Sequence, residues 1–449
     1  MAFENFPTRC YFIGIGGVSM SALALLLHDK GIQVRGSDLV ESDFTRKLRQ
    51  KGIPVHIGES EAIEEDFIVY TGAVGENNPQ FAAAKRAGKR LIPRAELLGR
   101  VADAFERVLA VSGCHGKTTT TCMLAHIFAS GKRPFTCHIG GEDLFLSNYH
   151  STGEEFFITE ACEFQRSFLT IHSEVALILN TDRDHTDCYA DDREIVEAYT
   201  QFASGAQKAV VNSDDRYARK IPHALSFGRY SGDITAGRIS SNGEKYRFTV
   251  YEKSVPMVDI SLGVHGRVHI QNALAAYAGA RLMGFSATEI KRGIEDFCGV
   301  KRRFERVGTL MGVPVICDYA HHPAELAATL KTAERICRGT VRLVFQPHTY
   351  TRTRDLMQDF VSVLKRAESP IIYKTYAARE PFDHAGSAYT LVSRIPEASY
   401  VQSPDQLKRR LLSEIQKDDL ILVLGAGDIY SVAQEILDDG STTKPSHKQ

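Results

Sequence analysis

The sequence lacks the features that would place a protein in a membrane, outside the cell or on nucleic acid. It has no run of about 18 apolar residues, so we expect no membrane insertion. The N-terminus, MAFENFPTRC, does not show the basic and then apolar order of a secretory signal, so we expect a cytoplasmic protein. Acidic residues number 55 and lysine plus arginine 54, without a long block of either sign, and this balance predicts no nucleic-acid partner.

Paired cysteines are also missing. The nine cysteines are odd in number, are scattered between Cys10 and Cys337 and form no CxxC pair, so we expect reduced thiols and no zinc cluster. What the chain does have is length, since 449 residues at about 100–200 residues per domain predict two to four domains. The polar tail 441–449, STTKPSHKQ, is predicted to be disordered.

The strongest local signal is the stretch 108–121, VLAVSGCHGKTTTT. An apolar run typical of a strand is followed by two glycines, a lysine and threonines that open a helix, which is the arrangement of a phosphate-binding loop. In such a loop Lys117 would reach the terminal phosphates of a nucleotide, and the hydroxyl of Thr118 would bind the accompanying Mg²⁺. The GxxxxGK[ST] pattern is matched in part, because Val111 stands where its first glycine belongs and Gly113 lies closer to the lysine.

A second glycine-rich turn lies near the N-terminus. A strand predicted over 10–13 runs into GIGGVSMSALALLLHDKG, and a second strand over 34–38 ends in an acidic residue. This is the order of a βαβ dinucleotide-binding unit, although Ser19 replaces the third glycine of GxGxxG. A Rossmann-like turn without a ligand is the alternative. Further short strands are predicted over 54–57 and 67–70.

Two polar strand ends follow the phosphate loop. A strand predicted over 156–160 ends on Glu160, and one over 175–179 runs into NTDRDHTD, which contains His185. A carboxylate and an imidazole at the ends of neighbouring parallel strands would supply ligands to Mg²⁺ beside the phosphates. The alternative is that both are simply polar strand ends.

The rest of the central region changes character. A strand over 208–212 continues the α/β pattern, whereas 234–262 predicts short antiparallel strands appended to the same domain. A helix over 271–283 then carries Asn272 near its start, where a side-chain amide can contact an adenine ring or cap the helix.

The last third of the chain has the pattern of a doubly wound α/β domain. Strands are predicted over 313–317, 341–345, 370–373 and 420–424, and helices over 323–337 and 355–365. Polar clusters follow two of these strands, with Asp318, Tyr319, His321 and His322 in the first and Gln346, His348, Tyr350 and Arg352 in the second. Because ligands bind at the carboxyl ends of parallel strands, both clusters predict ligand contacts.

Together these motifs resemble those of the Mur ligases, the ATP-dependent amide-forming enzymes of peptidoglycan assembly. The motifs span nearly the whole chain and are GIGGVSMSALA, GCHGKTTTT, NTDRDHTDCY, HIQNALAA, GVKRRFE, DYAHHP and FQPHTYTRT. The resemblance implies an α/β fold with three domains and a tail: a Rossmann-like N-terminal domain over 1–98, a P-loop-type central ATPase domain with a mostly parallel sheet over 99–303, a Rossmann-like C-terminal domain over 304–440, and the disordered tail 441–449.

The resemblance also implies roles for individual residues. Contacts to the UDP part of the substrate fall on Gly14, Gly16, Gly17, Ser19, Ser37, Asp38 and Thr71. Contacts to ATP fall on Gly113, His115, Gly116, Lys117, Thr118, Thr119, Asn272, Arg303 and Asp318. The metal ligands are Thr118, Glu160 and His185, and the catalytic positions are Lys117, Arg303, His321, His348 and Arg352.

The implied reaction is the ligation of L-alanine to the lactyl carboxylate of UDP-N-acetylmuramate, with ATP and Mg²⁺ and through an acyl phosphate, in peptidoglycan precursor synthesis. The implied partners are these two substrates, and a monomer or weak homodimer is expected. Three departures from the family pattern stand out: Thr349 replaces an arginine common in alanine-adding members, residues 162–166 replace an acidic stretch, and Cys317 stands where an aspartate often precedes Asp318. The alternatives left open are another small amino acid, such as glycine or L-serine, and a ready-made tripeptide on the same nucleotide sugar.

Two interpretations from other classes explain less of the sequence. A dinucleotide-dependent oxidoreductase would use GIGGVSMSA and GAGD, but it leaves Lys117, Glu160 and His185 without a role. A non-catalytic nucleotide-binding relative of the family would not need to keep these residues together with Thr118.

Overall fold

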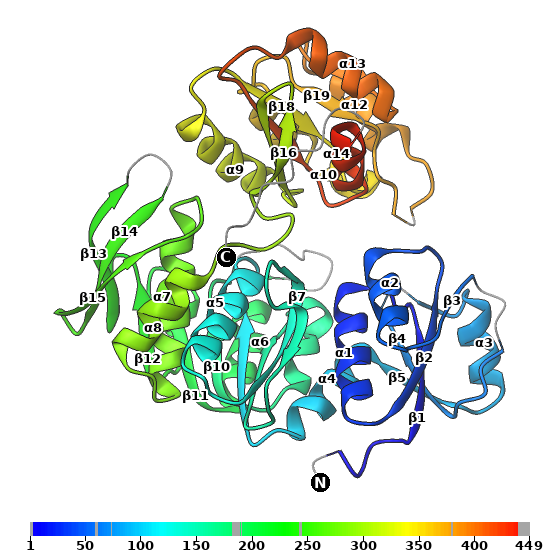
Figure 1. The fold of residues 1–449 in the computed structure, drawn as a ribbon, viewed down its shortest axis with the longest axis vertical. Coiled ribbons are helices and arrows are strands. Elements are labelled where there is room, and N and C mark those ends of the chain that lie inside the picture. The colour runs from blue at the N-terminus through cyan, green and yellow to red at the C-terminus, as the bar shows by residue number, and fades with distance from the viewer. Residues whose placement is uncertain are drawn as a thin grey trace. The chain divides into compact units, whose positions relative to one another are not determined.

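The computed structural model of the chain describes residues 3–58, 62–72, 74–181, 189, 191–241, 245–378 and 380–438. The chain divides into two compact units, the first made of Met1–Ser240 with Tyr246–Val300 and the second of Ser241–Lys245 with Lys301–Gln449. The first unit contains two sheets and the second contains one, each with helices packed against it (Figure 1). The α/β class is therefore confirmed, whereas domain boundaries at residues 98 and 303 stay predictions.

The first sheet is five-stranded and parallel, in the order β3-β2-β1-β4-β5. Four of the five residues of its central strand β1 are buried, as the apolar run there predicts for a strand covered on both faces. The elements are β1 (Arg9–Ile13), α1 (Val18–Asp29), β2 (Gln33–Asp38), α2 (Asp43–Gln50), β3 (Val55–Ile57), β4 (Phe67–Tyr70), α3 (Pro79–Arg86), β5 (Arg90–Pro93) and α4 (Arg94–Asp103).

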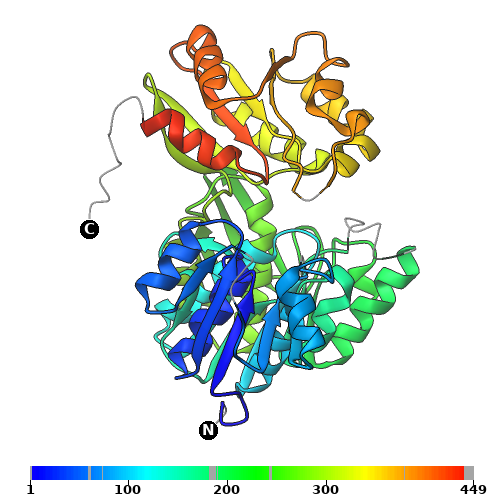
Figure 2. The same cartoon turned by 90° about the vertical axis from the view of Figure 1, so that its right-hand side faces the viewer.

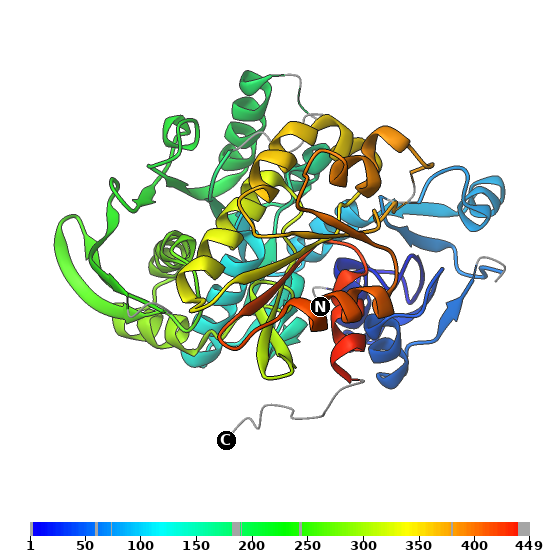
Figure 3. The ribbon, with the colours of Figure 1, turned by 90° about the horizontal axis from the view of Figure 1, so that it is seen from above.

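The second sheet has ten strands in the order β15-β14-β13-β12-β11-β10-β6-β9-β7-β8. Its central strands β9, β6, β10 and β11 are parallel, whereas β7 with β8 and β14 with β15 are antiparallel pairs. The strands β13–β15, green in Figure 3, contain the antiparallel pairing predicted for 234–262. The elements are β6 (Arg107–Ser112), α5 (Lys117–Ser130), β7 (Phe135–Asp143), β8 (Ser147–Ser151), β9 (Phe156–Glu160), β10 (Ser173–Ile178), α6 (Asp192–Ser204), β11 (Ala206–Asn212), β12 (Leu225–Gly228), β13 (Ile234–Ser241), β14 (Tyr246–Glu252), β15 (Val255–Ser261), α7 (Val268–Leu282) and α8 (Ala287–Asp296).

The first two sheets share one buried core. The ring of Phe105 stacks on that of Phe157 in β9, with centroids 4.7 Å apart. Apolar side chains of α1 and α4 belong to the same buried cluster as those of β6, β9 and β10. Helix α1 also packs against the β7–β8 hairpin, beside which it lies in Figure 1. The helix that follows the first glycine-rich turn therefore contacts the sheet that carries the phosphate loop.

The third sheet, in the second unit, has six strands in the order β16-β17-β21-β18-β19-β20. Only β16 with β17 is antiparallel among its pairs. Two separate apolar clusters cover its faces, and helices lie on both sides in Figure 2. The elements are β16 (Glu305–Leu310), β17 (Val313–Asp318), α9 (Pro323–Ile336), β18 (Val341–Phe345), α10 (Tyr350–Asp355), α11 (Met357–Leu364), β19 (Ile371–Tyr373), α12 (Ala388–Val392), β20 (Ser399–Val401), α13 (Pro404–Glu414), β21 (Leu420–Leu424) and α14 (Ile429–Asp438).

Most predicted elements exist, with small differences at their ends. The strands β9, β18 and β21 have the bounds that the sequence predicted. The helix predicted over 355–365 corresponds to α11, whereas α10, which begins at Tyr350 and is separated from α11 by Leu356 at φ −107° and ψ 20°, was not predicted. The residues of α10 are mostly polar, so the search for apolar residues at helical spacing does not detect its start.

Two observations on the described residues concern the cysteines and the helices. The eight cysteines among the described residues are all free. In the same part of the chain, no helix combines the length and the apolar character that crossing a bilayer requires. The predicted tail 441–449 and the predicted metal ligand His185 lie outside the described residues.

Candidate active site

The phosphate loop predicted from the sequence joins β6 to α5. The loop turns at Gly113 and Gly116, whose φ angles of 139° and 84° favour glycine. A Cβ atom at Gly116 would lie 2.6 Å from Oδ1 of Asn272, so the position has no room for a side chain. Thr118 and Thr119 follow in the first turn of α5, where helix N–H groups lack intrahelical partners. A turn of this kind suits a polyphosphate.

Lys117, the first residue of α5, is held by a buried carboxylate. Its Nζ atom lies 2.9 Å from Oε2 and 3.2 Å from Oε1 of Glu163, whose side chain is 2% exposed. Nζ also donates to the carbonyl oxygens of Gly113 and Cys114. Burial by itself would lower the pKa of Lys117, but the carboxylates of Glu163 and Glu160 outweigh burial and raise it above its usual value. A charged ammonium group is therefore fixed at the phosphate loop.

Two asparagines support the loop from neighbouring elements. Oδ1 of Asn180, which follows β10, accepts from the N–H of His115 at 2.9 Å, and its amide donates back to the carbonyl of His115 at 2.9 Å. Asn272 lies in α7, with Nδ2 at 3.3 Å from Nδ1 of His269. The N-cap of α7 is Arg267, so Asn272 does not cap the helix. Asn272 lies beside the phosphate loop, and its contact with adenine stays a prediction.

The predicted metal ligands that the structure describes approach one short stretch of β7. A Cβ atom at Gly140 would lie 2.7 Å from Oε2 of Glu160, and one at Gly141 would lie 2.7 Å from Cγ2 of Thr118. The N–H of Gly140 donates to Oε1 of Glu160 at 2.6 Å. Hydroxyl and carboxylate oxygens are the hard ligands that Mg²⁺ prefers, so this pair fits the metal. Within the described ranges no three His, Cys, Asp or Glu side chains cluster as a metal site, and His185 lies outside those ranges.

The residues predicted to contact UDP lie around the carboxyl ends of β1, β2 and β4. The N–H of Gly16 donates to Oδ2 of Asp38 at 2.8 Å, so a carboxylate from β2 closes the turn. Gly14, at φ 81°, has no room for a side chain, because a Cβ atom there would lie 2.7 Å from Cγ2 of Thr71. Gly17 is the N-cap of α1 and has no side chain to cap it. The three glycines form the turn that the sequence predicted, and Asp38 and Thr71 lie against it.

The two predicted serines use their hydroxyl groups inside the protein. Ser37 is buried and donates to Oε1 of Gln80 at 2.7 Å. Oγ of Ser19 lies 2.8 Å from Nε2 of His138, in the second sheet, and accepts from Arg94 at 3.2 Å. The backbone carbonyl of Ser37 accepts from the N–H groups of Gly14 and Ile15 in the turn, whereas the hydroxyl of Ser19 connects the turn to the neighbouring sheet.

In the second unit, Asp318 ends β17. Its Oδ2 accepts from the N–H of Phe304 at 2.7 Å and its Oδ1 from the N–H of Ala320 at 2.8 Å. Burial raises the pKa of this carboxyl above its usual value. Arg303 is exposed, with Cζ 5.2 Å from the ring centroid of Tyr319. Asp318 thus fixes the backbone directly after Arg303 and the backbone directly after β17, the two segments that carry the predicted ATP contacts of this unit.

His348, after β18, lies beside two of the three other predicted catalytic residues of this unit. Its ring centroid is 5.8 Å from that of His321, and its Nδ1 is 3.2 Å from Nη1 of Arg352. Burial, with His321 and Arg352 as neighbours, lowers the pKa of His348 to about 4, and burial also lowers that of His321. Because a guanidinium only donates, Nδ1 of His348 accepts and the neutral ring carries its proton on Nε2.

Thr349, which departs from the family pattern, has a local structural role. It adopts φ 64° and ψ 146°, an unusual conformation for a residue other than glycine. Its hydroxyl accepts from the N–H of Arg352 at 3.4 Å and caps α10. The threonine therefore fixes the start of the helix that carries Arg352.

Three residues with roles in this arrangement were not predicted. Glu163 and Asn180 follow β9 and β10, so the rule that ligands gather at strand ends provides a signal for both. His138 lies inside β7, where no comparable sequence signal exists.

Three protein-family models match this chain, one over the segment that forms each of the three sheets. The model of the "Mur ligase family, catalytic domain" matches residues 9–106, that of the "Mur ligase middle domain" matches 111–280, and that of the "Mur ligase, glutamate ligase domain" matches 302–427. A UDP-N-acetylmuramate–L-alanine ligase from Agathobacter rectalis is 36% identical over 96% of this chain and 98% of its own length.

Solved structures agree with this assignment. The UDP-N-acetylmuramate–alanine ligase of Thermotoga maritima is 25% identical, with a TM-score of 0.85 over 96% of this chain and 98% of that one. A murein peptide ligase from Psychrobacter arcticus, 21% identical with a TM-score of 0.74 over 97% and 99% of the two chains, shares the fold. With all three domains matched in order and a relative aligned end to end, this chain belongs to the Mur ligase family.

Proposed function

We propose that this protein is an ATP-dependent ligase that joins L-alanine to the lactyl carboxylate of UDP-N-acetylmuramate, in peptidoglycan precursor synthesis. The observation that carries the proposal is the phosphate loop, at which Glu163 holds the ammonium group of Lys117. The chain also aligns over 96% of its length with a relative named as a UDP-N-acetylmuramate–L-alanine ligase. The lysine at the start of the helix suits the terminal phosphates of a nucleoside triphosphate, whereas a dinucleotide-dependent oxidoreductase would leave Lys117 without a role.

In the first step, the lactyl carboxylate attacks the γ-phosphorus of ATP, and an acyl phosphate and ADP form. Both reactants are anionic, so the ammonium group of Lys117 would offset their repulsion and stabilise charge on the phosphoryl oxygens. Bound Mg²⁺ would add charge neutralisation at the same phosphates, and Thr118 and Glu160 are the described residues that would hold it. Arg303 is proposed as a further cation at the transferred phosphate.

In the second step, the amine of L-alanine attacks the acyl carbon, and phosphate leaves from the tetrahedral intermediate. We assign Arg352 to the carboxylate of the amino acid, because a guanidinium fits a carboxylate in two contacts. His348 is neutral at pH 7, since its pKa is lowered to about 4. To take the amine proton through Nδ1 it must release Arg352, so arrival of the amino-acid carboxylate would free the base.

We place this reaction in the cytoplasm, where the free cysteines of the described ranges would stay reduced. A monomer or weak homodimer is proposed as the working state. No nucleic-acid partner is proposed, because the chain carries balanced charge, with a formal net charge of −1.

The experiment that tests the proposal is phosphate release from ATP with each component omitted in turn. Release should require Mg²⁺, UDP-N-acetylmuramate and L-alanine together, and mass spectrometry should show the amide product. Lys117→Ala should abolish release, whereas Lys85→Ala, which removes an exposed lysine paired with Glu76, should leave it unchanged. An active Lys117→Ala protein would contradict the proposal.

A further inference from the structure

His138 lies between the two glycine-rich turns of the first unit. It is 2% exposed on β7, the strand that packs against α1 of the first sheet. In the parallel register of β7 with β9, His138 is the direct partner of Thr159, which precedes the predicted metal ligand Glu160. A single buried ring therefore lies between Ser19, a predicted substrate contact, and Thr159, the neighbour of a predicted metal ligand.

The hydrogen bonds through this ring form one continuous chain. Arg94 lies 3.2 Å from Oγ of Ser19, Oγ lies 2.8 Å from Nε2 of His138, Nδ1 lies 3.0 Å from Oγ1 of Thr159, and Oγ1 lies 3.1 Å from the carbonyl oxygen of Glu160. The carbonyl oxygen of Ser19 lies farther from Nε2, at 3.4 Å. The chain thus runs from the first sheet, through His138, to the end of β9.

The direction of the chain follows from its carbonyl end and from the state of the ring. The carbonyl oxygen of Glu160 can only accept, so Thr159 donates to it and accepts from Nδ1 of His138, and in a neutral ring Nε2 then accepts from Ser19. His138 therefore accepts at Nε2 from Ser19 and donates at Nδ1 to Thr159. A neutral ring is required, and burial together with Arg94 lowers the pKa of His138 to about 3.

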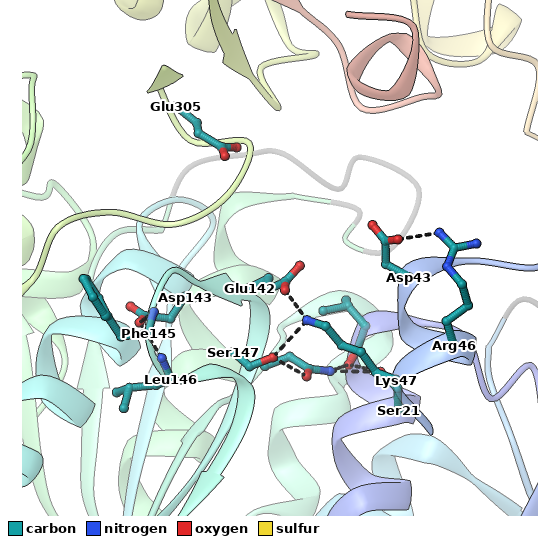
Figure 4. A network of polar contacts seen from close by, with 12 residues as sticks. Ser21, Asp43, Arg46, Lys47, Glu142, Asp143, Phe145, Leu146, Ser147 and Glu305 are labelled. Carbon is teal, nitrogen blue, oxygen red and sulfur yellow. Dashed lines mark hydrogen bonds and ion pairs between the residues drawn. The ribbon is translucent and has the colours of Figure 1, made fainter. Parts of the chain in front are cut away.

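The same hairpin contacts the carboxylate of Glu160 and the first sheet at other points. Two residues after His138, the N–H of Gly140 donates to Oε1 of Glu160 at 2.6 Å. Nδ2 of Asn148, on β8, donates to Oγ of Ser21 at 2.9 Å in α1. Figure 4 shows Lys47 of α2 between Glu142 and Ser147, to both of which it donates. The hairpin is thus held to the helices of the first sheet at Glu142, Ser147 and Asn148 as well as at His138.

We propose that His138 is a positioning residue that couples the nucleotide-sugar turn at Ser19 to the metal carboxylate Glu160, so that each ligand strengthens the binding of the other. This inference rests on the proposed function, because it takes Ser19 and Glu160 as contacts to UDP-N-acetylmuramate and to magnesium nucleotide. Whichever ligand binds first orders the chain of hydrogen bonds, and the second then binds to a site already arranged. The coupling is reciprocal by thermodynamic linkage.

The test is the dissociation constant of UDP-N-acetylmuramate by calorimetry on the full chain, with and without Mg²⁺ and a non-hydrolysable ATP analogue. In the native protein we expect binding about ten-fold tighter when the magnesium nucleotide is present. His138→Leu should bring this ratio to within about two-fold of unity, while binding of each ligand alone changes by less than about three-fold. His150→Leu, on β8 of the same hairpin, should keep the native ratio.

Variants at the far end of the chain separate a coupling role from a packing role. Thr159→Val removes the hydroxyl with little change in volume and should lose the coupling, whereas Thr159→Ser keeps the hydroxyl and should retain it. His138→Asn can replace only Nδ1, so it keeps the Thr159 contact, loses the Ser19 contact and should be uncoupled. The double variant His138→Leu/Thr159→Val should be no less coupled than either single variant.

Several outcomes would overturn the inference. They are a native protein in which the two ligands bind independently, a coupled His138→Asn or Thr159→Val variant, and an uncoupled Thr159→Ser variant. Failure of the proposed function is a different result, since a native protein that releases no alanine-dependent phosphate would fail the ligase assay whatever the binding ratio.

Discussion

The ion pair between Lys117 and Glu163 makes a prediction about stability that is separate from catalysis. The two side chains are 16% and 2% exposed, and Nζ lies 2.9 Å from Oε2. Removal of one member of a buried pair leaves an uncompensated charge and costs about 3–5 kcal/mol. We therefore expect Lys117→Met to lower the free energy of unfolding by about 3–5 kcal/mol, far more than loss of one contact at a surface.

The double-mutant cycle isolates the pair. Glu163→Gln should cost less, about 1.5–3 kcal/mol, because Lys117 is the more exposed member of the pair and keeps its hydrogen bonds to the carbonyl oxygens of Gly113 and Cys114. Lys117→Met/Glu163→Gln should be less destabilised than the sum of the single variants by about 2 kcal/mol, because no buried charge is left alone. Both variants that lack Lys117 should release no phosphate, so stability recovers in the double variant and activity does not.

The assay is urea denaturation followed by circular dichroism, with an exposed pair as the control. Lys85 and Glu76 form an ion pair whose side chains are 60% and 76% exposed, and the same cycle there should couple by less than about 0.5 kcal/mol. The pKa of Lys117 is raised in the folded state, so its contribution is present below the unfolded value of about 10.4 and is lost as the pH rises above it. A cycle at pH 7.5 that is additive within about 0.5 kcal/mol would refute the buried pair.

Further predictions concern the phosphate loop and the histidine cluster. Gly116→Ala should raise the KM for ATP at least about ten-fold, because the new Cβ atom would lie 2.6 Å from Asn272, whereas Gly31→Ala, at a similar φ of 82° and in open space, should cost only the backbone strain of about 1 kcal/mol and leave KM unchanged. A KM unchanged in both would show that the loop does not bind nucleotide. The pKa of His348 is lowered to about 4, so its stabilising contribution is present above pH 6.5 and is lost as the pH falls towards 4. His348→Gln should therefore reduce the acid-dependent loss of stability by up to about 1 kcal/mol per pH unit in urea titrations at pH 7 and 5, and an unchanged loss would contradict the buried neutral ring.

Local sequence patterns predicted the elements whose signals are local. The strands β9, β18 and β21 are apolar runs between polar turns, and their bounds agree with the prediction. The phosphate loop was recognisable from the order of strand, glycines, lysine and threonine. In these segments the prediction succeeds because the residues that form the recognisable pattern are the same residues whose burial stabilises the element.

Contacts between residues far apart in the chain could not be predicted from local sequence patterns. Glu163 is 46 positions from Lys117 along the chain, and Asn180 is 65 positions from His115, so only the sheet order brings each pair together. The β7–β8 hairpin contains Gly140 and Gly141 and lacks the alternation of a half-buried strand, and no element was predicted there. His138 meets Ser19 across 119 positions, which no spacing rule anticipates.

The measurement that tests the account most directly is the specificity constant for each acceptor in phosphate release with ATP, Mg²⁺ and UDP-N-acetylmuramate. The acceptors are L-alanine, glycine, L-serine and the tripeptide L-Ala-γ-D-Glu-meso-diaminopimelate. We predict the highest kcat/KM for L-alanine, with Thr349 a tolerated difference that caps α10. A higher value for the tripeptide or another amino acid, or no release with any acceptor, would contradict the proposed function.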